Sequence, residues 1–89
     1  MSDARTAVEK AIESKVIELA HALGIKDAHS LNPEDVLADK GWLDSASLME
    51  LLIWFEDSYC TEIPQEDLTQ ETFGTIRAMA DYLERRGIL

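Results

Sequence analysis

Residues 41–52 read GWLDSASLMELL, a loop that gives way to a helix at an Asp-Ser pair. Asp44 is a good N-cap because its carboxylate can accept hydrogen bonds from the free amides of the first helical turn, at the positive end of the helix dipole. Ser45 then occupies the first helical position, where its hydroxyl points into solvent. A serine that another enzyme modifies needs this exposure, so Ser45 is the first candidate functional residue.

The helix that starts at Ser45 is expected to run to about Tyr59. Successive residues of a helix point about 100 degrees apart. One face, which we expect to be core, therefore carries Leu48, Leu51, Leu52, Phe55 and Tyr59. The opposite face mixes carboxylates with apolar groups: Ala46, Glu50, Ile53 and Asp57, flanked by Met49 and Trp54. Exposed apolar groups that lie together are typical of contact sites. The alternative is that Ile53 and Trp54 are covered by a loop or by the last helix.

Upstream of residue 41, apolar residues at helical spacing predict a first helix from Asp3 to about Leu23. Gly24 can supply the left-handed conformation that ends such helices. Residues 25–43 form a long connection, expected to contain a short turn over Pro33 to Ala38. Four apolar side chains should hold it against the helices: Leu31, Val36, Leu37 and Leu43.

Downstream, Gln65 to Phe73 should form about one helical turn, with Leu68 and Phe73 pointing inward. Thr75 is expected to cap a last helix that Gly87 closes. The inner face of this helix carries Ile76, Met79, Ala80 and Leu83. The sequence therefore predicts an all-α fold, a small three- to four-helix bundle with a long loop between the first and second helices, as a single domain over residues 1–89.

The chain is strongly acidic, with 18 Asp and Glu, 8 Lys and Arg, and a formal net charge of -10. Binding to a nucleic-acid backbone depends on Lys and Arg, so DNA and RNA are poor candidates. Between Gly41 and Ile76 there are eight carboxylates and no Lys or Arg: Asp44, Glu50, Glu56, Asp57, Glu62, Glu66, Asp67 and Glu71. This field should steer basic partner surfaces toward the region.

Catalytic, metal and membrane motifs do not emerge from the sequence. The single cysteine, Cys60, excludes an internal disulfide and fits a reducing compartment. His21 and His29 have no ligand spacing with another His or Cys, and no motif supplies a base that would activate a serine. No signal peptide or membrane span is evident. We expect a cytoplasmic protein that is not an enzyme.

Asp44-Ser45, the short acidic helix and Glu62-Ile63-Pro64 together resemble the acyl carrier proteins, closely from Gly41 to Leu83. The resemblance implies that Ser45 carries a covalent 4'-phosphopantetheine arm from coenzyme A, with Asp44 beside it. It also implies these partners: a phosphopantetheinyl transferase, an acyl- or aminoacyl-activating enzyme, and downstream transferases or synthases. We expect a monomer, since carriers are usually monomeric.

In this family, partner enzymes recognise the helix that follows the serine. The resemblance assigns the charges of that surface to Asp44, Glu50, Glu56 and Asp57, and its apolar contacts to Ala46, Met49 and Ile53, with Trp54 as a further contact residue. Ala46 departs from the pattern, because carriers usually place a Leu, Ile or Met directly after the serine.

The sequence does not determine which cargo the arm would carry. The two residues between Gly41 and Asp44 look more like the D-alanyl and related stand-alone carriers than typical fatty-acid carriers. Fatty-acid or polyketide synthesis, amino-acid loading and a specialised pathway are all compatible, and we expect a stand-alone carrier. The alternative function is a small acidic helical adaptor that binds a protein partner without modification. A helical DNA-binding domain is a distant third and is opposed by the charge.

Overall fold

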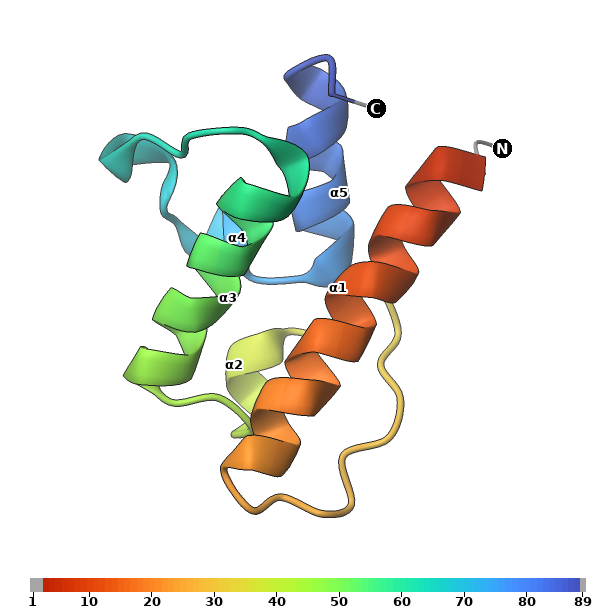
Figure 1. Cartoon of the computed structure of the whole chain (residues 1–89), viewed down its shortest axis with the longest axis vertical. Coiled ribbons are helices and arrows are strands. Elements are labelled where there is room, and N and C mark those ends of the chain that lie inside the picture. The colour runs from red at the N-terminus through yellow and green to blue at the C-terminus, as the bar shows by residue number, and fades with distance from the viewer. Residues whose placement is uncertain (1–2, 89) are drawn as a thin grey trace.

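The computed structural model describes residues 3–88, without the side chains of Asp3 and Gln70, so Met1, Ser2 and Leu89 of the predicted domain lie outside it. All its regular elements are helical, which confirms the predicted all-α bundle (Figure 1). They are α1 (Asp3–Ala22), α2 (Leu37–Lys40), α3 (Ser45–Tyr59), the 3-10 turn η1 (Gln65–Asp67), α4 (Gln70–Phe73) and α5 (Ile76–Arg85). No described helix is long and apolar enough to cross a membrane.

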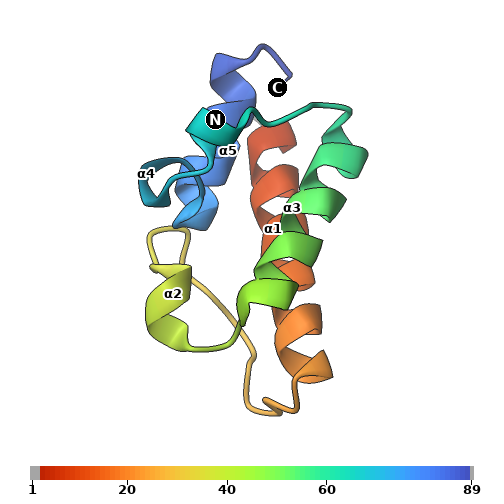
Figure 2. The ribbon, with the colours of Figure 1, turned by 90° about the vertical axis from the view of Figure 1, so that its left-hand side faces the viewer.

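Three longer helices build the core. α1 and α3 run side by side in opposite directions, and α5 packs against α1 (Figures 1 and 2). The largest fully buried side chains come from all three: Ile12, Val16, Leu51, Phe55, Ile76, Met79 and Leu83. α1 packs against the inner side of α3, whereas outer residues such as Glu50 and Ile53 are exposed to solvent.

The last helix follows its prediction. Thr75 caps it through a hydrogen bond from the Ala78 amide to the Thr75 Oγ1, at 3.0 Å. The four side chains expected on its inner face are all buried. Arg5 of α1 pairs with Asp81 at 2.7 Å and with Glu84 at 3.1 Å, and so joins α1 to α5.

The long loop between α1 and α3 is tied to α5 by its backbone. The Leu37 amide donates to the Gly74 carbonyl and the Arg77 amide to the Pro33 carbonyl, both at 2.9 Å. Leu31 and Leu37 are buried as expected, whereas Val36 and Leu43 are only half-buried.

The helical turn predicted over Pro33 to Ala38 was misplaced, because the short helix α2 spans Leu37–Lys40. Asn32 forms a closed turn instead: its amide donates to the Asp35 Oδ2 at 2.9 Å, and its carbonyl accepts from the Asp35 amide at 3.0 Å. Val36 then adopts an extended conformation, so the helix begins one residue later. Side-chain bonding of this kind competes with helix formation.

Three leucines assigned to the interior are exposed: Leu23, Leu48 and Leu68. Leu23 lies beyond the end of α1, which is one residue shorter than expected. Leu48 and Leu68 line an open pocket that is described below. Phe73 does point inward, with its ring centroid 5.5 Å from that of Phe55.

Candidate functional site at the start of α3

The start of α3 is defined by a side-chain cap. Asp44 has an extended backbone, and its Oδ1 accepts a hydrogen bond from the Ser47 amide at 2.8 Å, as predicted for an N-cap. The Leu48 amide donates to the Asp44 carbonyl at 2.9 Å and closes the first helical turn. Hydrogen bonds from the Ser47 amide and then from its hydroxyl hold the pKa of Asp44 below its ordinary value of 3.8.

Ser45 is the first residue of α3 and is exposed, as are its neighbours Asp44 and Ala46. Its hydroxyl is therefore accessible beside an ionised carboxylate. Ser47, two residues further on, is buried. Of the two serines in the first turn of α3, only Ser45 is open to an approaching enzyme.

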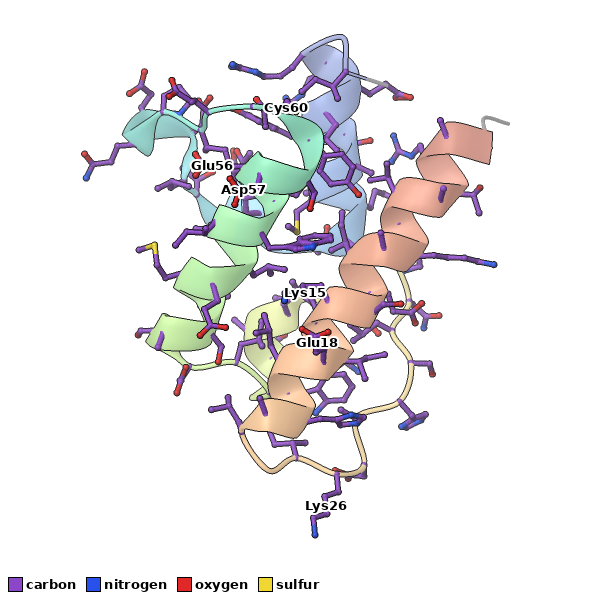
Figure 3. All side chains as sticks on the ribbon, viewed as in Figure 1. Lys15, Glu18, Lys26, Glu56, Asp57 and Cys60 are labelled. Atoms are coloured by element: carbon purple, nitrogen blue, oxygen red, sulfur yellow. The ribbon has the colours of Figure 1, made fainter. Side chains whose placement is uncertain are left out.

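The carboxylates predicted to form the partner surface of α3 differ in solvent exposure and in hydrogen bonding. Glu50 and Asp57 are exposed. Glu56 is half-buried, and its Oε2 accepts a hydrogen bond from the Ile63 amide at 2.9 Å. Figure 3 shows Glu56 and Asp57 near Cys60, at the end of α3 away from Ser45. The Glu56 carboxylate therefore binds the chain's own loop, a role that helix periodicity could not reveal.

The apolar residues on the outer side of α3 also separate into two kinds. Met49 and Ile53 are 56% and 52% exposed, which leaves both available for contact. Trp54 is half-buried and packs on the core, with its ring centroid 6.0 Å from that of Tyr59. The expected exposure of Trp54 therefore holds only in part, whereas Ile53 is exposed as expected.

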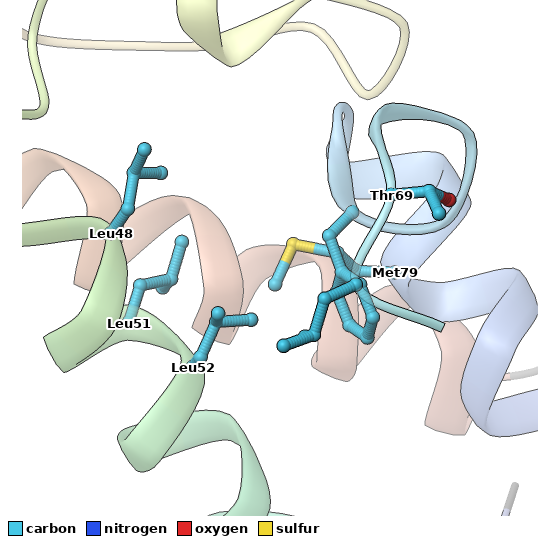
Figure 4. A pocket seen from close by; sticks show the side chains of 7 residues that line it. Leu48, Leu51, Leu52, Thr69 and Met79 are labelled. Carbon is cyan, nitrogen blue, oxygen red and sulfur yellow. The ribbon is translucent and has the colours of Figure 1, made fainter. Parts of the chain in front are cut away.

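A pocket of about 240 Å³ opens beside the first two turns of α3 (Figure 4). It is lined by Leu48, Leu51, Leu52, Leu68, Thr69, Phe73 and Met79. None of the described side chains that line it is ionisable. The sequence analysis missed the pocket because an apolar helical period marks an inward-facing side chain in the same way whether it meets core or a cavity.

The remaining candidate ligands lie apart from this site. Cys60 is exposed at the C-cap of α3. His21 and His29 bind backbone carbonyls, of Ala28 at 2.8 Å and of Asp27 at 2.6 Å. Across residues 3–88, no three His, Cys, Asp or Glu side chains gather in a way that would hold a metal ion.

The site residues fall within a region shared with known proteins. Residues 16–83 match the family described as "Phosphopantetheine attachment site". The chain is 32% identical over 76 residues to an acyl carrier protein of Syntrophobacter fumaroxidans. The aligned residues cover 84% of this chain and 90% of that protein. No solved structure matches significantly. The matched region includes Asp44, Ser45 and the whole of α3.

The lowered pKa of Asp44 predicts a pH-dependent cap. Its ionised form stabilises the fold fully above the pKa of the unfolded chain, and this stabilisation is lost as the pH falls through the folded pKa. Asp44→Asn keeps an acceptor without the charge. We expect the wild type to be more stable than this variant at neutral pH and the difference to shrink below pH 3.8. Urea unfolding at stepped pH measures it, and a difference that is constant with pH would contradict the assignment.

Proposed function

The chain belongs to the family of phosphopantetheine-binding acyl carrier proteins, which are carriers rather than enzymes, and from this we propose that Ser45 bears its 4'-phosphopantetheine arm. The observation that supports this is the exposure of Ser45 at the capped start of α3, inside the matched region. The arm supplies a thiol that holds cargo as a thioester.

The surroundings of Ser45 fit a group that other enzymes attach. A serine hydroxyl is a weak nucleophile without a base. His21 and His29, the two histidines of the chain, are hydrogen-bonded to the backbone around 27–28, at the other end of the long loop. Activation of the hydroxyl must therefore come from the transferase. What this chain contributes is a fixed helix start that presents Ser45, with Asp44 held ionised beside it.

The outer side of α3 is the partner surface that we propose. Its exposed charges are Asp44, Glu50 and Asp57, and its exposed apolar contacts are Ala46, Met49 and Ile53. No Lys or Arg lies between residues 41 and 76 to neutralise it. Partners should therefore present Arg and Lys around a small apolar patch: the transferase, an acyl- or aminoacyl-activating enzyme, and downstream transferases or synthases. Glu56 adds charge, and half-buried Trp54 adds only its outer edge.

We propose that the cargo is an apolar acyl group that rests in the pocket beside α3. Leu48, in the pocket wall, follows Ser45 by three residues, about 4.5 Å along the helix axis. The lining has no ionisable group that could pair with the ammonium of an aminoacyl cargo, and an unpaired charge is costly to bury. An amino acid carried on the same arm should therefore stay in solvent. We expect the pathway to be a biosynthetic one. Cys60 is an exposed free thiol, which is compatible with a monomer in the reducing cytoplasm.

The attachment is tested by intact mass after incubation with coenzyme A, Mg²⁺ and a broad-range phosphopantetheinyl transferase. We expect one phosphopantetheine on the wild type and none on Ser45→Ala, because the hydroxyl is the acceptor. Ser58→Ala, which removes an exposed serine from the last turn of the same helix, is the matched control and should be modified fully.

The same variants separate the carrier from the unmodified adaptor. If the protein is an adaptor, the Ser45→Ala variant should bind its partner as well as the wild type does. If it is a carrier, the variant should lose its function although circular dichroism shows that it is folded. If more than one transferase is tested and none modifies the wild type, the Asp44-Ser45 pair is only an ordinary helix start and the carrier function is wrong.

The partner surface is tested by charge reversal. Glu50→Lys and Asp57→Lys should each lower kcat/KM of the transferase by about tenfold at low salt, because electrostatic steering of the basic partner is lost. The loss should diminish at high salt. Glu18→Lys makes the same change of charge on α1 and should have little effect. Equal losses in all three variants would show a response to net charge rather than to the outer side of α3.

The cargo is tested by exchange of the loaded thioester with a small thiol in solution. A hexanoyl group should react several-fold more slowly than an alanyl group, after correction for the intrinsic rates of matched free thioesters, because the pocket shelters the apolar chain. Equal corrected rates would exclude shelter of the acyl group.

A further inference from the structure

A hydrogen bond from α5 holds the segment that forms one wall of the pocket. The Tyr82 hydroxyl donates to the Asp67 Oδ2 at 3.0 Å. Asp67 ends η1, and the next two residues, Leu68 and Thr69, line the pocket. Within the described residues, this is the one side-chain hydrogen bond that joins residues 60–69 to α5.

The segment Gln65–Thr69, which we call the flap, is also held at Thr69, whose carbonyl accepts hydrogen bonds from the Thr72 and Phe73 amides of α4 at 3.2 and 2.9 Å. Its backbone hydrogen bonds are local: the amides of Asp67, Leu68 and Thr69 donate to carbonyls two or three residues earlier, at 2.9 to 3.1 Å. Leu68 is 43% exposed. Local bonds and an exposed side chain are features of segments that open at low cost.

The flap lies across the pocket from α3. Figure 4 shows Leu48, Leu51 and Leu52 on α3 at one side and Thr69 on the flap at the other, with Met79 between them. Outward movement of the flap would therefore remove Leu68 and Thr69 from the pocket and expose its interior to water.

Tyr82 is a rigid anchor for this hydrogen bond. It is 4% exposed, and its ring packs 5.1 Å from that of Phe73, with the Arg86 guanidinium 5.4 Å from the ring centroid. Burial, and then the hydrogen bond to Asp67, raise the pKa of Tyr82, so the hydroxyl keeps the proton that it donates. The ring cannot follow the flap outward without leaving these contacts.

We propose that Tyr82 and Asp67 are positioning residues for the cargo: their hydrogen bond holds the flap against the pocket and so determines how well a bound acyl group is shielded from solvent. This inference rests on the proposed function for the identity of the cargo. The hold on the flap itself is a property of the chain without the arm, and it is tested separately.

The first test is amide hydrogen exchange, by NMR, of the chain without the arm. Tyr82→Phe removes only the hydroxyl and should speed exchange at Leu68 and Thr69 about tenfold, the factor expected for losing one hydrogen bond to a charged group. Asp67→Ala should do the same, and Asp67→Asn, which keeps an acceptor oxygen, should restore most of the protection. Tyr59→Phe is the control, because the Tyr59 hydroxyl has no hydrogen bond within the described residues.

The Leu51 amide in the centre of α3 reports global opening and should change less than Leu68 and Thr69 in every variant. Unchanged exchange at Leu68 and Thr69 in Tyr82→Phe, or an equal rise at Leu51, would overturn the hold on the flap, whatever happens at Ser45.

The second test loads hexanoyl on the arm and measures exchange of its thioester with a small thiol. Tyr82→Phe and Asp67→Ala should react several-fold faster than the wild type and Asp67→Asn, whereas an alanyl thioester should react at the same rate in all. If the flap loosens but the hexanoyl rates are equal, the shielding role is wrong. Failure of the proposed function is recognised separately, as a wild-type chain that takes no arm.

Discussion

The hydrogen bond from the Ser47 amide to the Asp44 carboxylate determines where α3 begins, and the rest of the site depends on that position. Without this hydrogen bond the first turn of α3 would lose its side-chain cap, and Ser45 would no longer lie at a fixed helix start. The same helix carries the buried Leu51 and Phe55 further along, so Ser45 lies at the start of a helix that is packed in the core.

The bundle leaves α3 only partly covered, and the features to which we assign a function lie along this helix. α1 packs against the inner side of α3, whereas its outer side meets solvent with Met49, Glu50 and Ile53. The pocket opens beside the same helix, and the flap forms one of its walls. The partner surface and the attachment point that we propose therefore lie on the same helix as one wall of the pocket.

The sequence predicted the elements whose ends carry a side-chain signal. Asp44 and Thr75 cap α3 and α5 as expected, and both helices lie where the apolar period placed them. The short helix near residue 37 was misplaced because the Asn32–Asp35 hydrogen bonds form a competing turn. A turn formed by such local hydrogen bonds leaves no periodic pattern of apolar residues in the sequence from which it could be predicted.

The site was harder to predict than the fold because its details depend on tertiary contacts. Leu48 and Leu68 have the spacing of core residues but line a pocket. Trp54 belongs to the outer side of α3 by period, but its ring packs on the core. Glu56 has the position of a partner contact, yet its carboxylate binds the Ile63 amide. The hydrogen bond between Tyr82 and Asp67 joins residues 15 apart and carries no local signal.

The function that we propose depends on Ser45 bearing the arm in the cell. The most direct measurement is top-down mass spectrometry of the protein isolated from its own cells, with fragmentation that locates every modification. We predict a phosphopantetheine on Ser45, with an apolar acyl group on its thiol in the loaded fraction. A folded population with an unmodified Ser45, or with the arm on another residue, would contradict the account.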